Sequence, residues 1–395
     1  MNADSPTLSK RILSIDILRG IVMIIMALDH TRDFFHIGAM TADPLNPDTT
    51  SGILFFTRWI THFCAPTFVF LSGLSAFLSA QSKTPTQASA FLLKRGLWLI
   101  FIEIVVITLG LTFNLHYNFI ILQVIWAIGC SMVFLALASR ISFKTVLIVG
   151  LVLVFGHNLF DLFPAPKNET SGLLLKVFFT ASGTVVPLNS NHLLAVFYAI
   201  LPWTGLMFLG YAVGAWYRKN YDADRRKRNL MIVGFLTLFI FIALRLINIY
   251  GDPAPRKEYH DLFKNLLSFF NVSKYPPSLQ YSSMTVGPAL LVLAFTENIS
   301  NWFAKIVRVY GAVPFFYYVL HFYLLHVILM VMFFATGHTA KEIVQVPFYF
   351  RPVAFGFNLP IVYLIWIGTV ASLYLPCKWF KQYKETHRQW WLRYV

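Results

Sequence analysis

Apolar stretches of about 20 residues, separated by short polar turns, follow one another along the chain. A membrane-spanning helix needs about 20 mostly apolar residues, because each residue adds about 1.5 Å across a hydrocarbon layer of about 30 Å. By this criterion we predict ten spans, at residues 13–36, 53–80, 91–112, 116–138, 143–163, 191–217, 229–250, 279–299, 309–335 and 352–376. The pattern predicts an all-α, polytopic membrane protein, a bundle of about ten transmembrane helices.

Basic residues predict the orientation of this bundle. With the N-terminus in the cytoplasm, 20 Lys and Arg side chains fall in inner segments, beginning with Lys10 and Arg11, and 8, including Lys167, fall in outer loops. Cytoplasmic loops of membrane proteins carry such an excess. We therefore predict that both termini are cytoplasmic, and that the basic, Trp-rich tail 378–395 is an amphipathic anchor on the inner leaflet.

Composition agrees with this class of protein and excludes others. Hydrophobic residues make up 57% of the 395 residues and charged residues 12%, about half the charged share of a globular domain. The net charge of +15 lies in short loops between spans, so it indicates topology and predicts no nucleic-acid partner. Three lone cysteines, Cys64, Cys130 and Cys377, have neither disulfide nor metal spacing. We predict a single domain, 1–395, without a metal.

The first span, 13–36, carries ionisable residues that a plain anchor lacks: Asp16, Arg19, Asp29, His30, Arg32, Asp33 and His36. A charged side chain at the bilayer centre costs about 2.5–3.5 kcal/mol on insertion scales, so these groups should face protein or water. Helical spacing places part of this set on one stripe, Asp16, Arg19, Met23, Met26, His30 and Asp33. We expect the stripe to point into the bundle.

The ionisable residues of this span form two groups. Asp16 and Arg19 lie one turn apart near the cytoplasmic end, so they either pair with each other or belong to a donor path. The second group lies in the outer half, and its two carboxylates, guanidinium and two imidazoles come within about two turns. A structural role for this group stays open, but its composition suits catalysis. The catalytic candidates are His30, His36, Asp29 and Asp33.

Further polar residues fall at the outer ends of other spans. Arg58 and His62 are one turn apart ahead of Pro66, a predicted kink, although Arg58 can also reach lipid headgroups and His62 can bind a backbone carbonyl. The acidic loop 38–52, rich in Pro and Gly, suits a lid or vestibule. The candidates for substrate binding are Arg32, Arg58, His62, His116, His192, Lys274 and Tyr275.

The span 309–335 contains two histidines within the hydrocarbon. His321 and His326 differ by about 140° around the helix, so they are poor joint ligands for a metal ion. Tyr318 and His321 share a face, which lines a cytoplasmic access path or forms a core pair. We assign His321, with Asp16 and Arg19, to structure or to the donor path.

The chain also resembles a known family, in the strings SIDILRGIVMIIMALDHTRDFFH, FFTRWITHFCAPTFVFLSGLSAFL, FYAILPWTGLMFLGYAVG, KYPPSLQYSSMTVGPALLVL and LPCKWF. They resemble bacterial membrane proteins grouped with the heparan-alpha-glucosaminide N-acetyltransferase catalytic domain. The resemblance implies an enzyme of the bacterial inner membrane that takes acetyl-CoA from the cytosol and acetylates a glucosamine amine on the far side. Asp16, Arg19 and Gly20 match the family's D-x-x-R-G opening. His30 stands where lysosomal members carry Asn, and His36 is the nearest counterpart of their catalytic His only with a gap.

Three hypotheses follow. In the first, the protein is an acyltransferase. A His takes the proton of an amine or hydroxyl acceptor that attacks acetyl-CoA, or it carries the acyl group itself. The partners of such an enzyme are acyl-CoA, a carbohydrate acceptor and the lipid bilayer. In the second, a proton-coupled transporter or flippase uses the same Asp and His residues. A structural or sensor protein is the third. Acyl transfer is favoured, with glycan modification as its result, and the oligomeric state stays open, a homodimer being one option.

Overall fold

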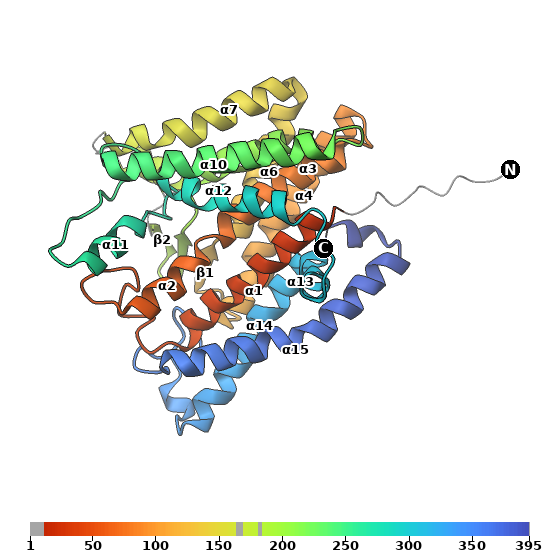
Figure 1. The fold of residues 1–395 in the computed structure, drawn as a ribbon. Coiled ribbons are helices and arrows are strands. Elements are labelled where there is room, and N and C mark those ends of the chain that lie inside the picture. Colours follow the sequence, from red (N-terminus) through yellow and green to blue (C-terminus); the bar gives the residue numbers. More distant parts are fainter. Residues whose placement is uncertain (1–11, 163–168, 181–183, 395) are drawn as a thin grey trace.

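The computed structural model describes residues 12–162, 169–180 and 184–394 (Figure 1). Lys10, Arg11 and Lys167, which entered the topology prediction, lie outside these residues. The helices are α1 (Leu13–Phe35), α2 (Gly52–Thr61), α3 (Cys64–Ala80), α4 (Pro85–Ile102), α5 (Thr108–Thr112), α6 (Val124–Ile141), α7 (Phe143–Gly156), α8 (Glu169–Leu175), α9 (Ile200–Gly214), α10 (Ala223–Ile247), α11 (Leu262–Phe270), α12 (Leu279–Phe295), α13 (Trp302–Ala312), α14 (Pro314–Ala335) and α15 (Leu359–Thr386). The strands are β1 (Phe119–Leu122), β2 (Thr184–Asn189) and β3 (His192–Val196).

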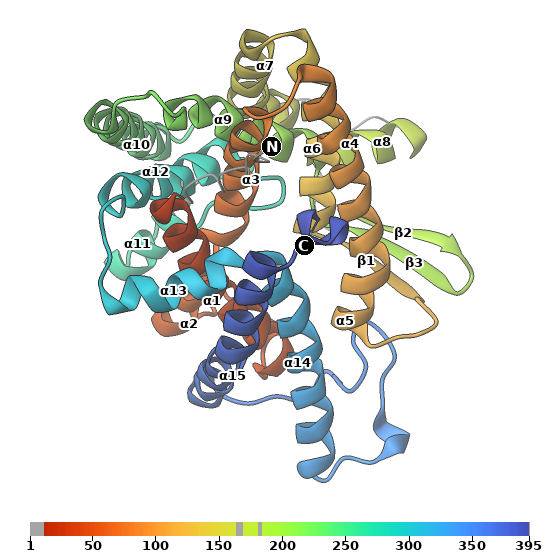
Figure 2. The ribbon, with the colours of Figure 1, turned by 90° about the vertical axis from the view of Figure 1, so that its right-hand side faces the viewer.

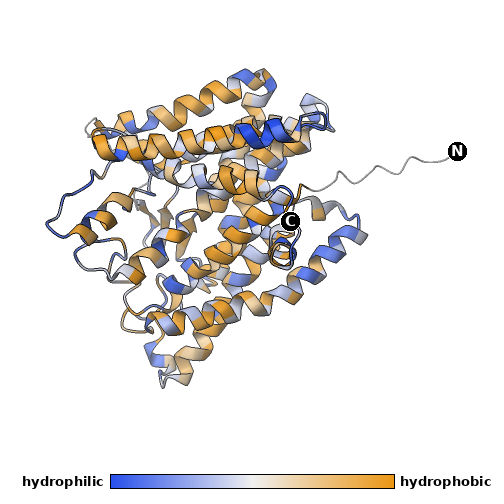
Figure 3. Ribbon diagram, in the orientation of Figure 1, coloured by the Kyte–Doolittle hydropathy of each residue, from blue (hydrophilic) through white to orange (hydrophobic). Residues whose placement is uncertain are grey.

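Six stretches of helix in the described residues are long and apolar enough to cross a membrane: Gly52–Ala80, Val124–Ile141, Phe143–Leu162, Ala223–Ile247, Pro314–Ala335 and Leu359–Thr386. Hydrophobic residues make up most of α7 and of α10 beyond its charged first turns (Figure 3), and many of them are exposed, as a lipid-facing helix requires. The protein is therefore a mostly helical membrane protein. The predicted number of about ten spans and the cytoplasmic termini stay predictions.

Helix α1 runs through the middle of the bundle, between α7 and α10 on one side and α14 and α15 on the other (Figure 1). It contacts α2, α3, α12, α13, α14 and α15. Its crossing with α13 is very close: a Cβ on Gly20 would lie 2.0 Å from the Val307 carbonyl oxygen, and one on Gly311 would lie 1.8 Å from the Asp16 carbonyl oxygen. The glycine of the D-x-x-R-G motif, Gly20, is therefore needed because any side chain at this position would collide with the backbone of α13.

The predicted span 53–80 is broken in two, and the break precedes the predicted kink at Pro66. Helix α2 ends at Thr61 and α3 begins at Cys64. Proline has no N–H, so the carbonyl of His62, four residues earlier, loses its helical partner. The hydroxyl of Tyr281 on α12 donates to this carbonyl at 2.8 Å instead. The break is therefore stabilised from a neighbouring helix.

The all-α prediction missed a small sheet. Its order is β1-β3-β2, with β1 parallel to β3 in the register Phe119↔Leu193 and β2 antiparallel to β3. Figure 2 shows β2 and β3 projecting from one side of the bundle. The predicted spans 116–138 and 191–217 therefore begin in strands, because short apolar runs next to an apolar helix do not differ from it in hydropathy.

Three further boundaries differ from the prediction. The predicted span 309–335 begins inside α13, a separate helix that ends at Ala312. Helix α15 runs from Leu359 to Thr386, so the first part of the predicted anchor 378–395 continues a long helix. Between α4 and α5 the chain forms one π-helical turn, Glu103–Ile107.

Candidate active site

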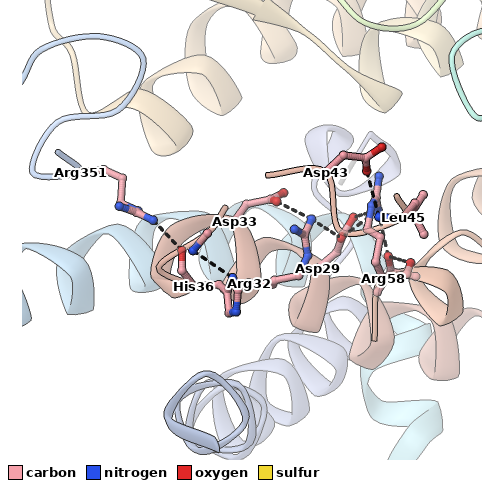
Figure 4. Close-up of polar contacts among 10 residues, drawn as sticks. Asp29, Arg32, Asp33, His36, Asp43, Leu45, Arg58 and Arg351 are labelled. Carbon is pink, nitrogen blue, oxygen red and sulfur yellow. Dashed lines mark hydrogen bonds and ion pairs between the residues drawn. The ribbon is translucent and has the colours of Figure 1, made fainter. Parts of the chain in front are cut away.

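An ion-pair network joins the outer end of α1 to α2 (Figure 4). Asp29 accepts hydrogen bonds from Arg58 Nη1 at 2.8 and 2.9 Å and from Arg32 Nη2 at 3.3 Å. Arg32 also contacts Asp33 at 2.6 Å. Asp29 lies one turn before Arg32 and Asp33 directly follows it, while Arg58 comes from the last turn of α2. Two carboxylates and two guanidiniums thus balance one another; three of them are largely buried, and the side chain of Asp33 is 43% exposed.

His30 takes no part in this network and points to α14 instead. Its Nδ1 lies 2.6 Å from Nε2 of His321, and the two rings stack with centroids 4.9 Å apart. Phe322 stacks against the same imidazole at 4.4 Å. Asp29 and Asp33, the neighbouring carboxylates on α1, do not orient this imidazole. His321 is the hydrogen-bond partner of His30 instead, because both carboxylates are engaged by arginines.

The hydrogen bonds of this pair assign both tautomers. Nδ1 of His321 faces the Tyr317 carbonyl oxygen at 3.2 Å, and a carbonyl only accepts, so this nitrogen carries the proton. In a neutral imidazole Nε2 of His321 is then the acceptor, and His30 Nδ1 must donate to it. Nε2 of His30 is left with its lone pair, ready to take a proton or attack a carbonyl carbon.

A cavity of about 390 Å³ opens at the outer end of the ion-pair network. Its walls come from α1, from α2 and the residue that follows it, His62, from the loop after α1 and from the segment that follows α11. The predicted vestibule, loop 38–52, therefore does contribute to a cavity. The lining residues are Arg32, Asp33, Ala39, Asp43, Pro44, Leu45, Arg58, His62, Asn271, Val272, Ser273, Lys274 and Tyr275.

A second cavity, of about 320 Å³, lies toward the opposite end of α1. Its walls are mostly apolar side chains of α3, α4 and α6, and three basic side chains, Arg19, Arg95 and Lys384, also line it. Arg19 donates hydrogen bonds to Asp16 at 3.3 Å, to the Gly311 carbonyl at 3.1 Å and to the Ser75 hydroxyl at 3.1 Å. Asp16 and Arg19 therefore pair, and the arginine faces the cavity as well.

The histidine pair lies between the two cavities. Along α1, Met23 lines the second cavity and Asp33 the first, and His30 falls between them, about 10 Å from Met23 and about 5 Å from Asp33 along the axis. Tyr318 lines the second cavity, and its ring centroid lies 6.3 Å from that of His30 and 5.5 Å from that of His321. The predicted stripe on α1 thus faces the interior, and Tyr318 links one cavity to the pair.

Three other predicted histidines lie apart from both cavities. His36 Nδ1 accepts the N–H of Gly38 at 3.2 Å, and its carbonyl accepts from Arg351 at 2.7 Å. His192 Nε2 contacts the carbonyl oxygen of His116 at 3.2 Å beside the small sheet.

Arg351 holds the loop before α15 against the end of α1. Burial lowers the pKa of its guanidinium to about 10, so the side chain still carries its charge at neutral pH.

Sequence reasoning missed one buried carboxyl group, on a helical turn that contacts α14. Glu103, at the start of the π-helical turn, is fully buried, and its Oε1 accepts the N–H of Gln123 at 2.6 Å. Its Oε2 has no partner among the described residues. A lone acidic residue within an apolar span was the available signal, since such residues are rare in membranes. Within the described part of the chain, no group of His, Cys, Asp or Glu is arranged to hold a metal ion.

Comparison with known families supplies the remaining evidence. The family profile described as heparan-alpha-glucosaminide N-acetyltransferase, catalytic, matches residues 11–250, more than half of the chain. The chain belongs to this family. The matched segment carries His30, the ion-pair network and His62, while Lys274 and His321 follow it. Membership indicates a membrane acetyltransferase, whose family uses acetyl-CoA as the donor. Among curated proteins, no sequence matches the chain.

Proposed function

We propose that the protein moves an acetyl group from cytosolic acyl-CoA to an extracytoplasmic amino sugar or glycan. The observation that carries this proposal is the His30 and His321 pair, with its assigned tautomers, between two cavities at opposite ends of α1. Transfer across a membrane requires a reacting centre that donor and acceptor approach from opposite sides. Membership of the acetyltransferase family supports the same reaction.

The cavity lined by Arg19, Arg95 and Lys384 suits the donor. Coenzyme A carries phosphates on its nucleotide and an extended pantetheine arm that ends in the thioester. Guanidinium and ammonium groups bind phosphates, and the apolar walls suit the arm. Excess basic residues in the same end of the bundle favour a cytoplasmic location for this cavity. In this orientation the other cavity faces outward and receives the acceptor.

The reaction needs one base and a route for one proton. As the acceptor nitrogen attacks the thioester carbonyl carbon, the C–N bond forms and Nε2 of His30 takes the amine proton. His321 Nε2 accepts the hydrogen bond from His30 Nδ1 and so stabilises the imidazolium. The C–S bond then breaks, and the leaving sulfur regains the proton from His30, with Tyr318 placed to relay it. Alternatively Nε2 attacks the thioester itself and an acyl-imidazole delivers the group.

Transfer across a sealed membrane tests the proposal. Purified protein is reconstituted into proteoliposomes, with radiolabelled acetyl-CoA on one face and glucosamine on the other. We expect labelled product only when the donor is on the face of Arg19, and a His30→Gln variant should lose about 10²- to 10⁴-fold in rate, the usual contribution of a general base. A burst of CoA release without acceptor would indicate the acyl-imidazole route.

Variants of His321 test its role in positioning His30. His321→Gln retains an oxygen that can accept the Nδ1–H of His30, so it should keep more activity than His321→Leu, and the pH–rate profile should move in both. His260→Gln is the control, because this exposed side chain lies on an outer loop outside both cavities. Equal activity of His30→Gln and His260→Gln in folded protein would refute the proposal.

A proton-coupled transporter is the second candidate, favoured by the single proton that His30 and His321 share. It predicts uptake of an amino sugar driven by a pH gradient, without consumption of acetyl-CoA. The same proteoliposomes distinguish the two functions, because only the acyltransferase releases free CoA.

A further inference from the structure

The outer cavity contains a largely buried ammonium group that forms no ion pair with a described residue. Lys274, in the segment that follows α11, lines this cavity and is only 9% exposed. Its ammonium lies 5.2 Å from the ring centroid of its neighbour Tyr275. Among the described residues, no carboxylate lies within ion-pair distance of it. A buried charge normally has a partner, because removing an ion from water is costly unless it is compensated.

The carboxylates of the same region are already engaged. Asp29 binds Arg58 and Arg32, and Asp33 binds Arg32, so these two acids are neutralised by two guanidiniums. Asp43, which also lines the cavity, is exposed and accepts the backbone N–H of Leu45 at 2.9 Å. With Asp43 the three carboxylates of this region equal its three cations in number, but Lys274 forms no ion pair with any of them.

His62 gives a second, independent indication of a ligand. Its side chain lines the same cavity and is 0% exposed, and neither ring nitrogen has a hydrogen-bond partner among the described residues. Its backbone carbonyl is occupied by Tyr281, so the bond that satisfies the main chain does not reach the ring. Buried polar groups are almost always satisfied, so an unpartnered imidazole in the wall of this cavity indicates a ligand group that pairs with it.

We propose that the outer cavity binds an acceptor that carries an anionic group, a carboxylate or a phosphate, held by Lys274 with His62 as a neighbouring donor. This assignment deepens the proposed function and rests on it for the identity of the ligand as the acyl acceptor. A neutral hexosamine would leave Lys274 without an ion-pair partner, and its amine in the protonated form would add a like charge. A sugar with both an amine and an anion supplies a partner for Lys274.

Binding of matched amino sugars tests this inference without relying on turnover. The probes are glucosamine, glucosamine 6-phosphate and muramic acid, which is glucosamine with a lactyl carboxylate; inorganic phosphate alone is a fourth arm. Affinities come from ligand-dependent melting of the detergent-purified protein. We expect one or both anionic sugars to bind about 10- to 100-fold more tightly than glucosamine, the effect of one charge-assisted hydrogen bond. The arm that binds identifies carboxylate or phosphate.

Two lysine variants show whether Lys274 causes the preference for anionic sugars. Lys274→Met keeps the length of the side chain without its charge and should remove the preference for anionic sugars. Lys264→Met is the matched control, since this lysine lies on α11, close to Lys274 in the sequence, but its side chain is 38% exposed and pairs with Asp48 at 3.1 Å. It should keep the preference. The melting temperature without ligand shows that both variants are folded.

Two results would overturn the inference. One is equal affinity, or no measurable binding, for glucosamine and both anionic sugars in the unaltered protein. The other is an anion preference that survives in folded Lys274→Met. Failure of the proposed function looks different, because it appears as absent transfer from acetyl-CoA in the proteoliposomes, whatever the sugars do at the outer cavity.

Discussion

The contact between Arg58 and Asp29 gives the sharpest prediction about stability. Arg58 donates twice to the carboxylate of Asp29, and both side chains are 12% exposed. Removing one partner of a buried ion pair costs about 3–5 kcal/mol, because the other charge stays buried without compensation. Arg32, at 3.3 Å, still contacts Asp29 after the change. We therefore expect Arg58→Met to lower the free energy of unfolding by about 3 kcal/mol, at the low end of that range.

A double-mutant cycle separates this pair from general damage to the site. Asp29→Asn removes the charge that Arg58 compensates, so the double variant Asp29→Asn/Arg58→Met should be less destabilised than the sum of the single variants by about 2 kcal/mol, within the range for residues in direct contact. The assay is unfolding in detergent micelles, followed by circular dichroism, with the same detergent and protein concentration throughout.

The exposed pair of Lys264 and Asp48 is the control for this cycle. Its side chains are 38% and 53% exposed, so water screens the attraction and Lys264→Met should cost no more than about 1 kcal/mol. The reasoning would be refuted if Arg58→Met and Lys264→Met had the same effect. Strict additivity of the two changes at Asp29 and Arg58 would refute it as well.

Two further predictions concern packing and the outer loop. Gly20→Ala should destabilise the protein by about 1–3 kcal/mol, because its Cβ would collide with the Val307 backbone, whereas Gly368→Ala, whose Cβ would meet nothing within 4 Å, should be neutral or slightly stabilising; melting temperatures of the two variants test this. Arg351→Met should lower the free energy of unfolding by about 2–4 kcal/mol and loosen the loop before α15, because the carbonyls of His36, Pro352 and Phe355 lose their donor. Hydrogen exchange of the loop tests this, and an exchange rate equal to that of the unaltered protein would contradict it.

Hydropathy predicted the class of fold but misplaced several boundaries. It located long helices such as α10 and α14, because a window of 18 or more apolar residues is a strong signal. It could not separate β1 from α6 or β3 from α9, since each strand is apolar and joins an apolar helix. It also could not detect the break at His62, which depends on a hydroxyl from α12.

The candidate site was predicted in part for similar reasons. Asp29, Arg32 and Asp33 are neighbours on one helix, so spacing alone brought them together. The partner of His30 could not be predicted in this way, because His321 lies 291 positions away in the sequence. Helical spacing describes one helix at a time and carries no information about which face of α14 meets α1.

The sequence by itself determined that the chain is a helical membrane protein of an acetyltransferase family, that its first helix carries buried charge, and that this charge must face the interior. These conclusions depend on local composition and on the cost of charge in lipid, which need no knowledge of packing. Only the tertiary structure decided that His30 pairs with His321, that two cavities approach the pair from opposite ends, and that Lys274 lines the cavity beside the ion-pair network without an ion pair to a described residue. Each of these depends on the packing of segments far apart in the chain, and contact between such segments is a property of the folded bundle.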